Sequence, residues 1–379
     1  MSNDLVPDGW AVKSVGEIAA VTMGQSPPSY VVNDGGDGLP FIQGNAEFGA
    51  RYPKPRQFAA ECPKVVDAGD ILLSVRAPVG EVNVAPGRLC IGRGLAGLRP
   101  TGGDYDFLYF ALRGLASVFA RFSQGSTFDA INGKDLRAIP LLVPPLDEQR
   151  RIAEVLRSVD EAIAINEAVA SQALCAYQAA LAELIGNSDD HWQTVRLGEL
   201  ATFVNGRGFK PHEWGDEGLP IIRIQNLNGG TDFNFYNGEF NPKILVQPGD
   251  LLFAWSGSRG TSFGPHIWRG PQGVLNYHTW KVVPKVAEDR DYLYFALRHL
   301  TKKIEDEAHG ASALVHMQKA YVVDYEVELP PLAERRAIAA TLTDLLEAAN
   351  HANRVSIEAR AVRGHLLADL LSGRVRVPA

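Results

Sequence analysis

Cysteines and long apolar runs are scarce in this sequence of 379 residues. Its three cysteines, Cys62, Cys90 and Cys175, are widely separated and form no C-x-x-C pair, which argues against both a disulfide framework and a zinc site. No run of about 18 uncharged apolar residues occurs, and the N-terminus lacks a basic segment followed by an apolar stretch. The sequence therefore predicts a cytoplasmic protein without a membrane span or a signal peptide.

The usual catalytic signatures are missing as well. Gly133 and Lys134 lack the upstream glycine and the following hydroxyl residue of a phosphate-binding loop. There is no G-x-G-x-x-G between a strand and a helix, no H-E-x-x-H and no G-x-S-x-G. We therefore expect no catalytic residues, no metal and no cofactor, and a binding protein is favoured over an enzyme.

An excess of basic charge is also absent, since the formal net charge is −7. Taken alone, this disfavours a nucleic-acid-binding protein, because neutralising phosphates requires a basic surface. The acidic residues are unevenly distributed, however: residues 147–185 carry three basic and seven acidic side chains. These residues lie on a predicted helix, so the acidic excess need not face a nucleic acid.

What the sequence does contain is an internal duplication at a spacing of about 180 to 186 residues, far longer than a solenoid repeat. A chain of this length is also expected to form more than one domain. Four landmarks recur in the same order: Trp10 to Ala19 with Trp192 to Ala201, Gly69-Asp70 with Gly249-Asp250, Leu-Tyr-Phe-Ala-Leu-Arg at 108–113 and 293–298, and Pro-Pro-Leu at 144–146 and 330–332.

Each repeat has the same predicted internal order. Short β-branched and aromatic runs at 39–42, 70–75, 221–224 and 250–255 predict strands joined by Gly- and Pro-rich turns. A helix is predicted around each Leu-Tyr-Phe-Ala-Leu-Arg. Each Pro-Pro pair then predicts the rigid entry into a long helix, because proline fixes its own φ and restricts the preceding residue.

The two long helices carry apolar residues at alternating steps of four and three, as in a coiled coil. The first seam comprises Ile152, Leu156, Val159, Ile163, Asn166, Ala170, Ala173, Tyr177 and Ala180 or Leu181, and the second Ile338, Leu342, Leu345, Ala349, Ala352, Ser356 and Ala359. Helices of about 39 residues extend for about 58 Å, too long to be buried in one globular core. The second segment, with seven arginines and five acids, complements the acidic first. The alternative is that each helix packs only on its own domain.

Together these residues resemble the specificity (S) subunits of type I restriction–modification systems, over residues 8 to 379. The resemblance rests on the domain starts at Trp10 and Trp192, the Gly-Asp phrases, the strand phrase 219–226, the Pro-Leu-x-Glu-x-Arg helix starts and the ending at 370–377. Each phrase is weakly specific alone. Their twofold occurrence, in order and at constant spacing, makes the resemblance strong.

The resemblance implies an α+β fold in which two duplicated mixed α/β target-recognition domains are separated by two long antiparallel coiled-coil helices with pseudo-twofold symmetry. The implied boundaries are 1–146 for the first recognition domain, 147–186 for the first spacer helix, 187–332 for the second domain, and 333–379 for the second spacer helix and tail. It also implies a non-catalytic subunit in which each domain reads one half of a split double-stranded DNA site. The implied partners are two methyltransferase (M) subunits, which restriction (R) subunits can join.

Candidate DNA-contacting residues are polar side chains in loops at equivalent places of the two repeats. Arg and Lys suit guanine edges and phosphates, while Asn and Gln suit adenine. In the first repeat the candidates are Gln25, Ser26, Gln43, Asn45, Arg76, Arg93, Gln124, Ser126 and Lys134. In the second they are Arg207, Arg223, Gln225, Asn226, Ser258, Arg259, His278 and Lys319. Each residue taken singly is as readily explained as a solvated turn side chain or a strand cap.

Two other functions stay open at this point. A duplicated protein-binding scaffold could use the helix pair as a docking surface without reading DNA. A nuclease could use scattered carboxylates such as Asp70 and Asp250, although a repeated Gly-Asp is more simply a turn before a strand.

Overall fold

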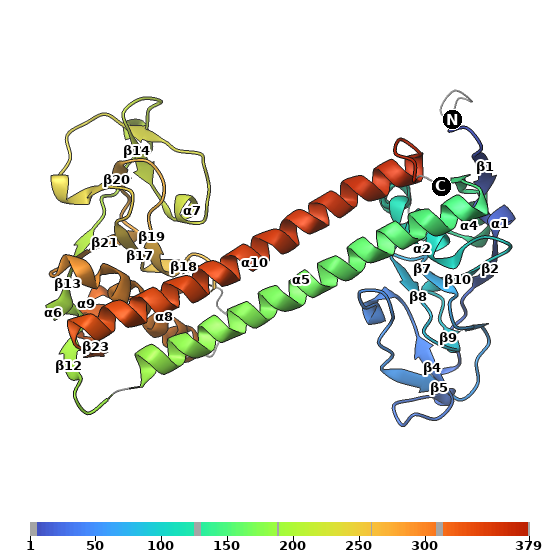
Figure 1. The fold of residues 1–379 in the computed structure, drawn as a ribbon, viewed down its shortest axis with the longest axis horizontal. Helices are drawn as coiled ribbons and strands as arrows, with labels where there is room; N and C mark the ends of the chain where they lie inside the picture. The colour runs from blue at the N-terminus through green and yellow to red at the C-terminus, as the bar shows by residue number, and fades with distance from the viewer. Residues whose placement is uncertain (1–5, 125–129, 188, 259, 308–313, 378–379) are drawn as a thin grey trace. The chain divides into compact units, whose positions relative to one another are not determined.

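The computed structural model describes residues 6–124, 130–187, 189–258, 260–307 and 314–377. The chain divides into two compact units (Figure 1). Unit 1 comprises residues 1–167 and 354–379, and unit 2 comprises residues 168–353. Because each unit contains residues from both long helices, the helices are part of both units.

The described residues of unit 1 form three sheets and four short α-helices besides its parts of the two long helices. Its four-stranded sheet has the order β2 (Ala19–Met23), β10 (Leu95–Pro100), β7 (Ile71–Ser74) and β8 (Val82–Val84). Its five-stranded sheet has the order β3 (Val32–Asn33), β5 (Gln57–Ala59), β4 (Leu39–Ile42), β9 (Leu89–Ile91) and β6 (Val65–Val66). A further pair joins β1 (Ala11–Ser14) to β11 (Pro140–Val143). The helices are α1 (Val15–Ile18), α2 (Tyr105–Gly114), α3 (Ala116–Gln124) and α4 (Gly133–Ala138).

Unit 2 repeats this arrangement with small changes. The order β13 (Ala201–Asn205), β21 (Thr279–Pro284), β17 (Leu251–Ala254) and β19 (Gly264–Ile267) matches the four-stranded sheet of unit 1. A second sheet has the order β15 (Phe235–Tyr236), β14 (Leu219–Ile222), β20 (Gly273–Leu275) and β16 (Leu245–Val246). Two pairs join β12 (Gln193–Arg196) to β23 (Glu326–Leu329) and β18 (Ser256–Ser258) to β22 (Leu314–His316). The helices are α6 (Leu197–Leu200), α7 (Ile224–Leu227), α8 (Arg290–Glu307) and α9 (Lys319–Asp324).

The structure confirms the predicted strands and the helices at Leu-Tyr-Phe-Ala-Leu-Arg, with one correction. The strand predicted at 221–224 ends at Ile222, and Ile224 begins the short helix α7. The turn is fixed by the Asn226 side chain, which accepts a hydrogen bond from the backbone N of Arg223 at 3.0 Å. A side chain that caps the backbone locally thus ends the strand earlier than its apolar pattern suggests.

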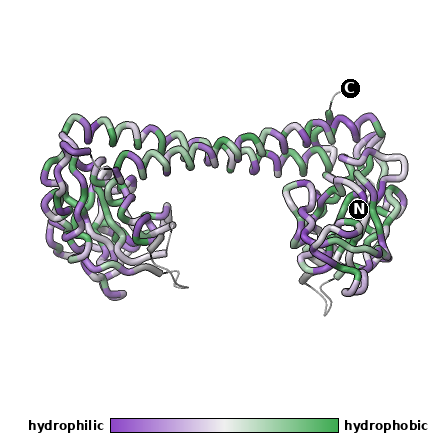
Figure 2. Tube along the Cα trace, turned by 90° about the horizontal axis from the view of Figure 1, so that it is seen from below, coloured by the Kyte–Doolittle hydropathy of each residue, from purple (hydrophilic) through white to green (hydrophobic). Residues whose placement is uncertain are grey.

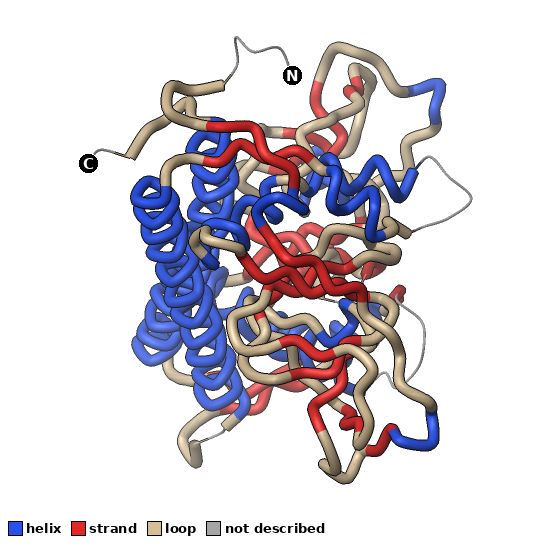
Figure 3. Tube along the Cα trace, turned by 90° about the vertical axis from the view of Figure 1, so that its right-hand side faces the viewer, coloured by secondary structure: helices blue, strands red, loops and turns tan. Residues whose placement is uncertain are grey.

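The two long helices are α5 (Leu146–Gly186) and α10 (Leu332–Ser372), each of 41 residues. Within unit 1 they run antiparallel, since Asp160 of α5 pairs with Arg363 of α10 and Glu167 pairs with Arg360, while Glu148 near the start of α5 pairs with Arg376, just beyond the end of α10. Every residue of the two predicted seams is buried or half-buried. The predicted heptad pattern therefore describes the paired faces. In Figure 3 the long helices lie beside the strands, and the shorter helices lie among the strands.

Both helices also enter the cores of the units. In unit 1, Ile152 and Leu156 of α5 and Leu367 and Leu370 of α10 belong to the same buried cluster as the strands. In unit 2, the C-terminal part of α5, including Tyr177, is buried with the N-terminal part of α10. The alternative in which each helix packs only on its own domain is wrong, because each unit also buries the helix that follows the other repeat.

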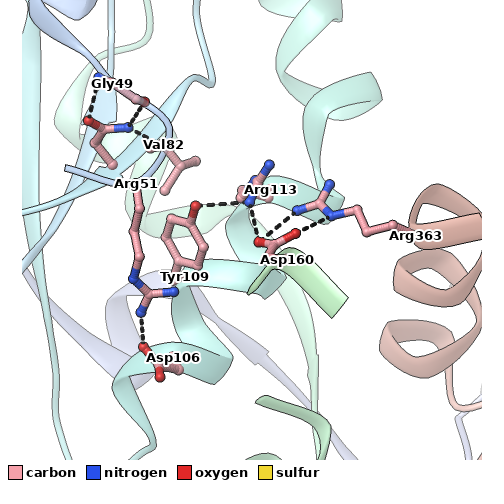
Figure 4. A network of polar contacts seen from close by, with 9 residues as sticks. Gly49, Arg51, Val82, Asp106, Tyr109, Arg113, Asp160 and Arg363 are labelled. Carbon is pink, nitrogen blue, oxygen red and sulfur yellow. Dashed lines mark hydrogen bonds and ion pairs between the residues drawn. The ribbon is translucent and has the colours of Figure 1, made fainter. Parts of the chain in front are cut away.

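A network of charged side chains joins α5 and α10 to the globular part of unit 1 (Figure 4). The Asp160 carboxylate of α5 accepts hydrogen bonds from Arg113 Nη1 of α2 at 3.0 Å and from Arg363 Nε of α10 at 2.8 Å. Arg113 Nη1 also donates to the Tyr109 hydroxyl at 2.9 Å. One carboxylate thereby connects three helices.

The repeated tryptophan and glutamate landmarks have a structural role. Trp10 Nε1 donates to Glu148 Oε2 at 3.0 Å in unit 1, and Trp192 Nε1 donates to Glu334 Oε1 at 3.2 Å in unit 2. Glu148 is buried and also accepts from Arg376 Nε at 2.6 Å, which holds the pKa of its carboxyl below the usual value. Each pair attaches the start of a repeat to the start of the long helix that ends it.

Candidate nucleic-acid interface

Each unit has a corner where the four-stranded sheet meets the second sheet, and the two corners share one backbone framework. In corner 1, Gln25 N donates to Ile91 O at 3.0 Å, and in corner 2, Arg207 N donates to Leu275 O at 2.9 Å. Further equivalent bonds join Val75 N to Gly94 O, at 2.9 Å, and Trp255 N to His278 O, at 3.3 Å. Corner 1 carries Gln25, Ser26, Gln43, Arg76 and Arg93; corner 2 carries Arg207, Arg223, Trp255, Tyr277 and His278.

Glycine is required where the chain enters each corner. A Cβ at Gly24 would lie 2.1 Å from Gly92 O, and a Cβ at Gly206 would lie 2.1 Å from Asn276 O. Any side chain at these positions would displace the backbone, so the repeated glycine is explained by close approach of two segments. The residue after each glycine is thereby fixed at the surface.

Corner 1 gathers three predicted contact residues, Ser26, Gln43 and Arg93, into one hydrogen-bonded group, and Gln25 lies next to Ser26 in the chain. The Ser26 hydroxyl donates to Gln43 Oε1 at 3.0 Å and accepts from the backbone N of Arg93 at 3.3 Å. Gln25 and Arg93 are exposed, and Ser26 and Gln43 are half-buried. The group presents an amide, a hydroxyl and a guanidinium, which are side chains that read base edges and bind phosphates.

In corner 2, two predicted arginines are engaged by their own unit. The Arg207 guanidinium is paired with Glu213 and lies 4.8 Å from the ring centroid of Tyr236. Hydrogen bonding to Tyr236 and the charge of Glu213 together raise the pKa of Arg207. Arg223 lies 5.4 Å from the Trp214 ring. Both are half-buried, so a DNA contact would use only part of each guanidinium.

The surface of corner 2 is aromatic instead. Tyr277 and His278 lie with ring centroids 3.8 Å apart, and Trp255 lies 5.6 Å from His278. Burial, followed by the charge of the neighbouring His316, lowers the pKa of His278. His278 is therefore neutral near pH 7, and it offers a hydrogen-bonding aromatic ring in place of a cation.

The other predicted residues fall into three groups. Arg76, Lys134, Gln225 and Ser258 are exposed, and Asn45 is half-buried. Asn226 and Lys319 are engaged internally: the buried Asn226 amide donates to Gly230 O and Asp232 O at 3.0 Å, and Lys319 Nζ donates to Phe203 O. The structure thus argues against a base contact by Asn226, whose amide holds its own loop. Ser126 and Arg259 lie outside the described residues, and Gln124 ends α3 without a described side chain.

The sequence prediction included only one residue of the aromatic surface of corner 2, His278. Its neighbours Trp255, Tyr277 and His316 are not among the predicted contacts, because the prediction gave no weight to aromatic rings. A signal was available in the sequence. Arg93 and Tyr277 occupy equivalent positions of the two repeats, so the prediction that Arg93 is a surface contact also indicates a surface contact at Tyr277.

The carboxylates considered for a nuclease have structural partners. Asp70 is buried and paired with Arg99 Nη2 at 2.6 Å, and Asp250 is paired with Lys281 Nζ at 2.7 Å. Each follows a glycine with positive φ, Gly69 at 86° and Gly249 at 94°, as a turn before a strand requires. Within the described ranges, no group of three or more His, Cys, Asp or Glu side chains could hold a metal.

Comparison with known proteins agrees with the duplication. The family model of the type I restriction modification DNA specificity domain matches residues 7–173 and again residues 189–359. The chain is 45% identical over 165 residues to the MjaX specificity subunit of Methanocaldococcus jannaschii, covering 42% of this chain and 39% of that protein. It is 22% identical over 411 residues to the MjaIX specificity subunit of the same organism, covering 98% of this chain and 95% of that protein.

Two solved structures share the fold over almost the whole chain. The S subunit of a type I restriction–modification system from M. genitalium matches with a TM-score of 0.65 at 16% identity, covering 98% of both chains. A chain from a structure on the assembly and conformational transition of the type I R-M system matches with a TM-score of 0.62 at 17% identity, covering 98% of this chain and 99% of that one.

Proposed function

The chain belongs to the type I restriction–modification DNA specificity family, as a non-catalytic specificity subunit with two recognition domains, and from this we propose that each domain reads one half of a split DNA site. The domains proposed are residues 1–146 and 187–332, with the first spacer helix at 147–186 and the second spacer helix and C-terminal tail at 333–379. The observation that supports this proposal best is the pair of corners. The two corners share one backbone framework but carry different side chains, as is expected of two domains that read different half-sites.

A domain exchange tests this modular reading. Residues 1–146 are replaced by the corresponding region of a relative with another specificity, and methylated adenines are mapped on the DNA of cells that make the complex. One half of the methylated motif should change, while the other half and the gap between them stay the same. A change in both halves would contradict the assignment of one domain to each half-site.

The helix pair is the proposed docking surface for two M subunits, which R subunits can join. Both helices expose large apolar side chains outside their seam, including Ile165, Ile357 and Val362 in unit 1. Apolar residues are interspersed with polar ones along both helices (Figure 2). By length and composition alone α5 could also cross a membrane. Its seam packs on α10, however, and we assign its exposed apolar residues to protein partners.

The helix pair is also proposed to set the gap between the half-sites. Four residues inserted after Leu181 lengthen α5 by about 6 Å, near two base-pair steps of about 3.4 Å. The motif should then keep both halves while the undefined gap lengthens by one or two base pairs. An unchanged gap in an active complex would leave the helices as a docking surface only.

Because the chain has a net charge of −7, it is expected to bind DNA weakly by itself. Specific binding should appear when M subunits are added, and it should weaken steeply as salt concentration rises. Nanomolar specific binding by the isolated chain at physiological salt would contradict this expectation. A scaffold that binds only protein would assemble with M subunits and confer no sequence preference on the complex.

A further inference from the structure

Corner 2 contains a column of aromatic rings that runs from the core of unit 2 to its surface. Phe253 and Trp280 have ring centroids 5.7 Å apart and planes inclined by 15°, and Trp280 and Trp255 have centroids 6.1 Å apart and planes inclined by 19°. Phe253 and Trp280 are buried, while Trp255 is half-buried. Because residues two apart on an extended chain point to the same side, Phe253 and Trp255 both meet the strand that carries Trp280.

Tyr277 is held at the surface end of this column. Trp255 Nε1 donates to the Tyr277 carbonyl at 2.9 Å, which fixes the backbone, and the ring of His278 supports the Tyr277 ring from one side. Tyr277 is nevertheless 47% exposed. An aromatic ring that is supported behind and open in front is prepared to contact a flat ligand at a small loss of conformational entropy.

The equivalent positions of corner 1 have a different chemistry. The strand pairings Ala96 to Leu73 and Trp280 to Phe253 place Arg93 where unit 2 has Tyr277. By the same strand registers, Gly94 of unit 1 is equivalent to His278 of unit 2, and Val75 is equivalent to Trp255. One corner therefore presents a guanidinium, and the other an aromatic ring, from the same place in the fold.

Resting on the proposed DNA reading, we propose that Tyr277 stacks on a base of the half-site read by unit 2, with His278 and Trp255 as positioning residues. Aromatic side chains stack on bases, and apolar side chains inserted between base steps separate them. The column behind Tyr277 supplies the support that such an insertion needs. Arg93, at the same position of corner 1, binds its half-site through charge.

The experiment compares variants of the complex with M subunits on a duplex that carries its own methylated motif, at several salt concentrations. Tyr277→Ala should raise Kd about tenfold and leave the slope of log Kd against log salt unchanged, because stacking releases no counterions. Arg93→Ala should weaken binding and reduce the steepness of that slope by about one. Tyr277→Phe keeps the ring and should bind like the wild type.

A fluorescent base analogue supplies a readout that a merely structural role would not change. With 2-aminopurine placed through the half-site read by unit 2, the wild-type complex should change the fluorescence at the base step that Tyr277 contacts, and Tyr277→Ala should abolish this change. If Tyr277→Ala binds like the wild type, or Tyr277→Phe binds as weakly as Tyr277→Ala, the stacking proposal is overturned while specific DNA reading stands. If the wild-type complex shows no sequence preference, the proposed function fails, and this proposal fails with it.

Discussion

In and beside the charged network around Asp160, two ion pairs of similar length differ in solvent exposure, so their contributions to stability can be compared. Two ion pairs join α5 to α10 in unit 1. Asp160 and Arg363 have side chains that are 28% and 15% exposed, whereas Glu167 and Arg360 are 41% and 62% exposed. The distances are similar, at 2.8 Å and 2.6 Å. An account of stability that only counts ion pairs would assign the same contribution to both pairs.

The expected energies differ because water screens the second pair. Breaking a buried ion pair by removing one partner destabilises by about 3–5 kcal/mol, and breaking an exposed pair by about 0–1 kcal/mol. Asp160 is partly exposed but neutralises two arginines, Arg113 and Arg363 (Figure 4). Asp160→Asn leaves these two cations beside a neutral amide. We expect it to destabilise unit 1 by about 2 kcal/mol, and Glu167→Gln by less than about 0.5 kcal/mol.

Native-state hydrogen exchange measures both effects in the full chain. The amide protons of residues 354–372 of α10 report local opening, and their protection should fall about thirtyfold in Asp160→Asn and about twofold or less in Glu167→Gln. Adding Arg363→Met to Asp160→Asn should restore part of the loss, because one unpaired cation is removed. Equal losses in the two single variants would refute the reasoning that lower exposure and the second arginine make Asp160 the larger contributor.

The remaining predictions concern a buried hydroxyl, a close backbone approach and mild acid. Within the described residues the buried Tyr177 hydroxyl has no hydrogen-bond partner, so Tyr177→Phe should leave thermal stability unchanged or raise it, and a fall of several degrees would show that the hydroxyl is satisfied. Gly24→Ala should weaken specific DNA binding by the complex at least tenfold, whereas Gly44→Ala, with open space around its Cβ, should not; equal effects would contradict the steric argument. Burial lowers the pKa of His266 and of His299, both in unit 2, so their contribution to stability is complete above the unfolded pKa of about 6.5 and is lost as pH falls below it. Hydrogen exchange at pH 7.5 and pH 5.5 should show unit 2 losing more protection than unit 1.

Much of the fold follows from the sequence because it rests on periodic patterns. The heptad steps predict both long helices, and the duplication predicts that the second unit repeats the first. The patterns do not predict where a helix or strand ends when a single side chain determines that end. Asn226 illustrates this: its amide caps a short helix where β-branched residues predict a continuing strand. Local capping competes with apolar periodicity, and the outcome depends on the three-dimensional loop.

The sequence predicted which loops lie together in the two units, but not the role of each side chain in them. Loops at equivalent places in the repeats do form the two corners. The role of each side chain could not be predicted, because the same polar residue type can either stabilise its own loop or contact a ligand. Lys319 donates to a backbone carbonyl, whereas Lys134, its counterpart in the first repeat, is exposed.

The duplicated landmarks and the differing positions have different physical origins. Tyr109 and Arg113 of α2 recur as Tyr294 and Arg298 of α8, with the same hydrogen bond of 2.9 Å between guanidinium and hydroxyl. The helix residues that meet each arginine do not recur: Arg113 meets the Asp160 carboxylate, and Arg298 lies 5.6 Å from the ring of Tyr177. Attachment of the helices thus uses an ion pair in one unit and a cation–π contact in the other. The two corners show the same behaviour. Duplication repeats the backbone framework, and side chains that point away from this framework can differ between the units.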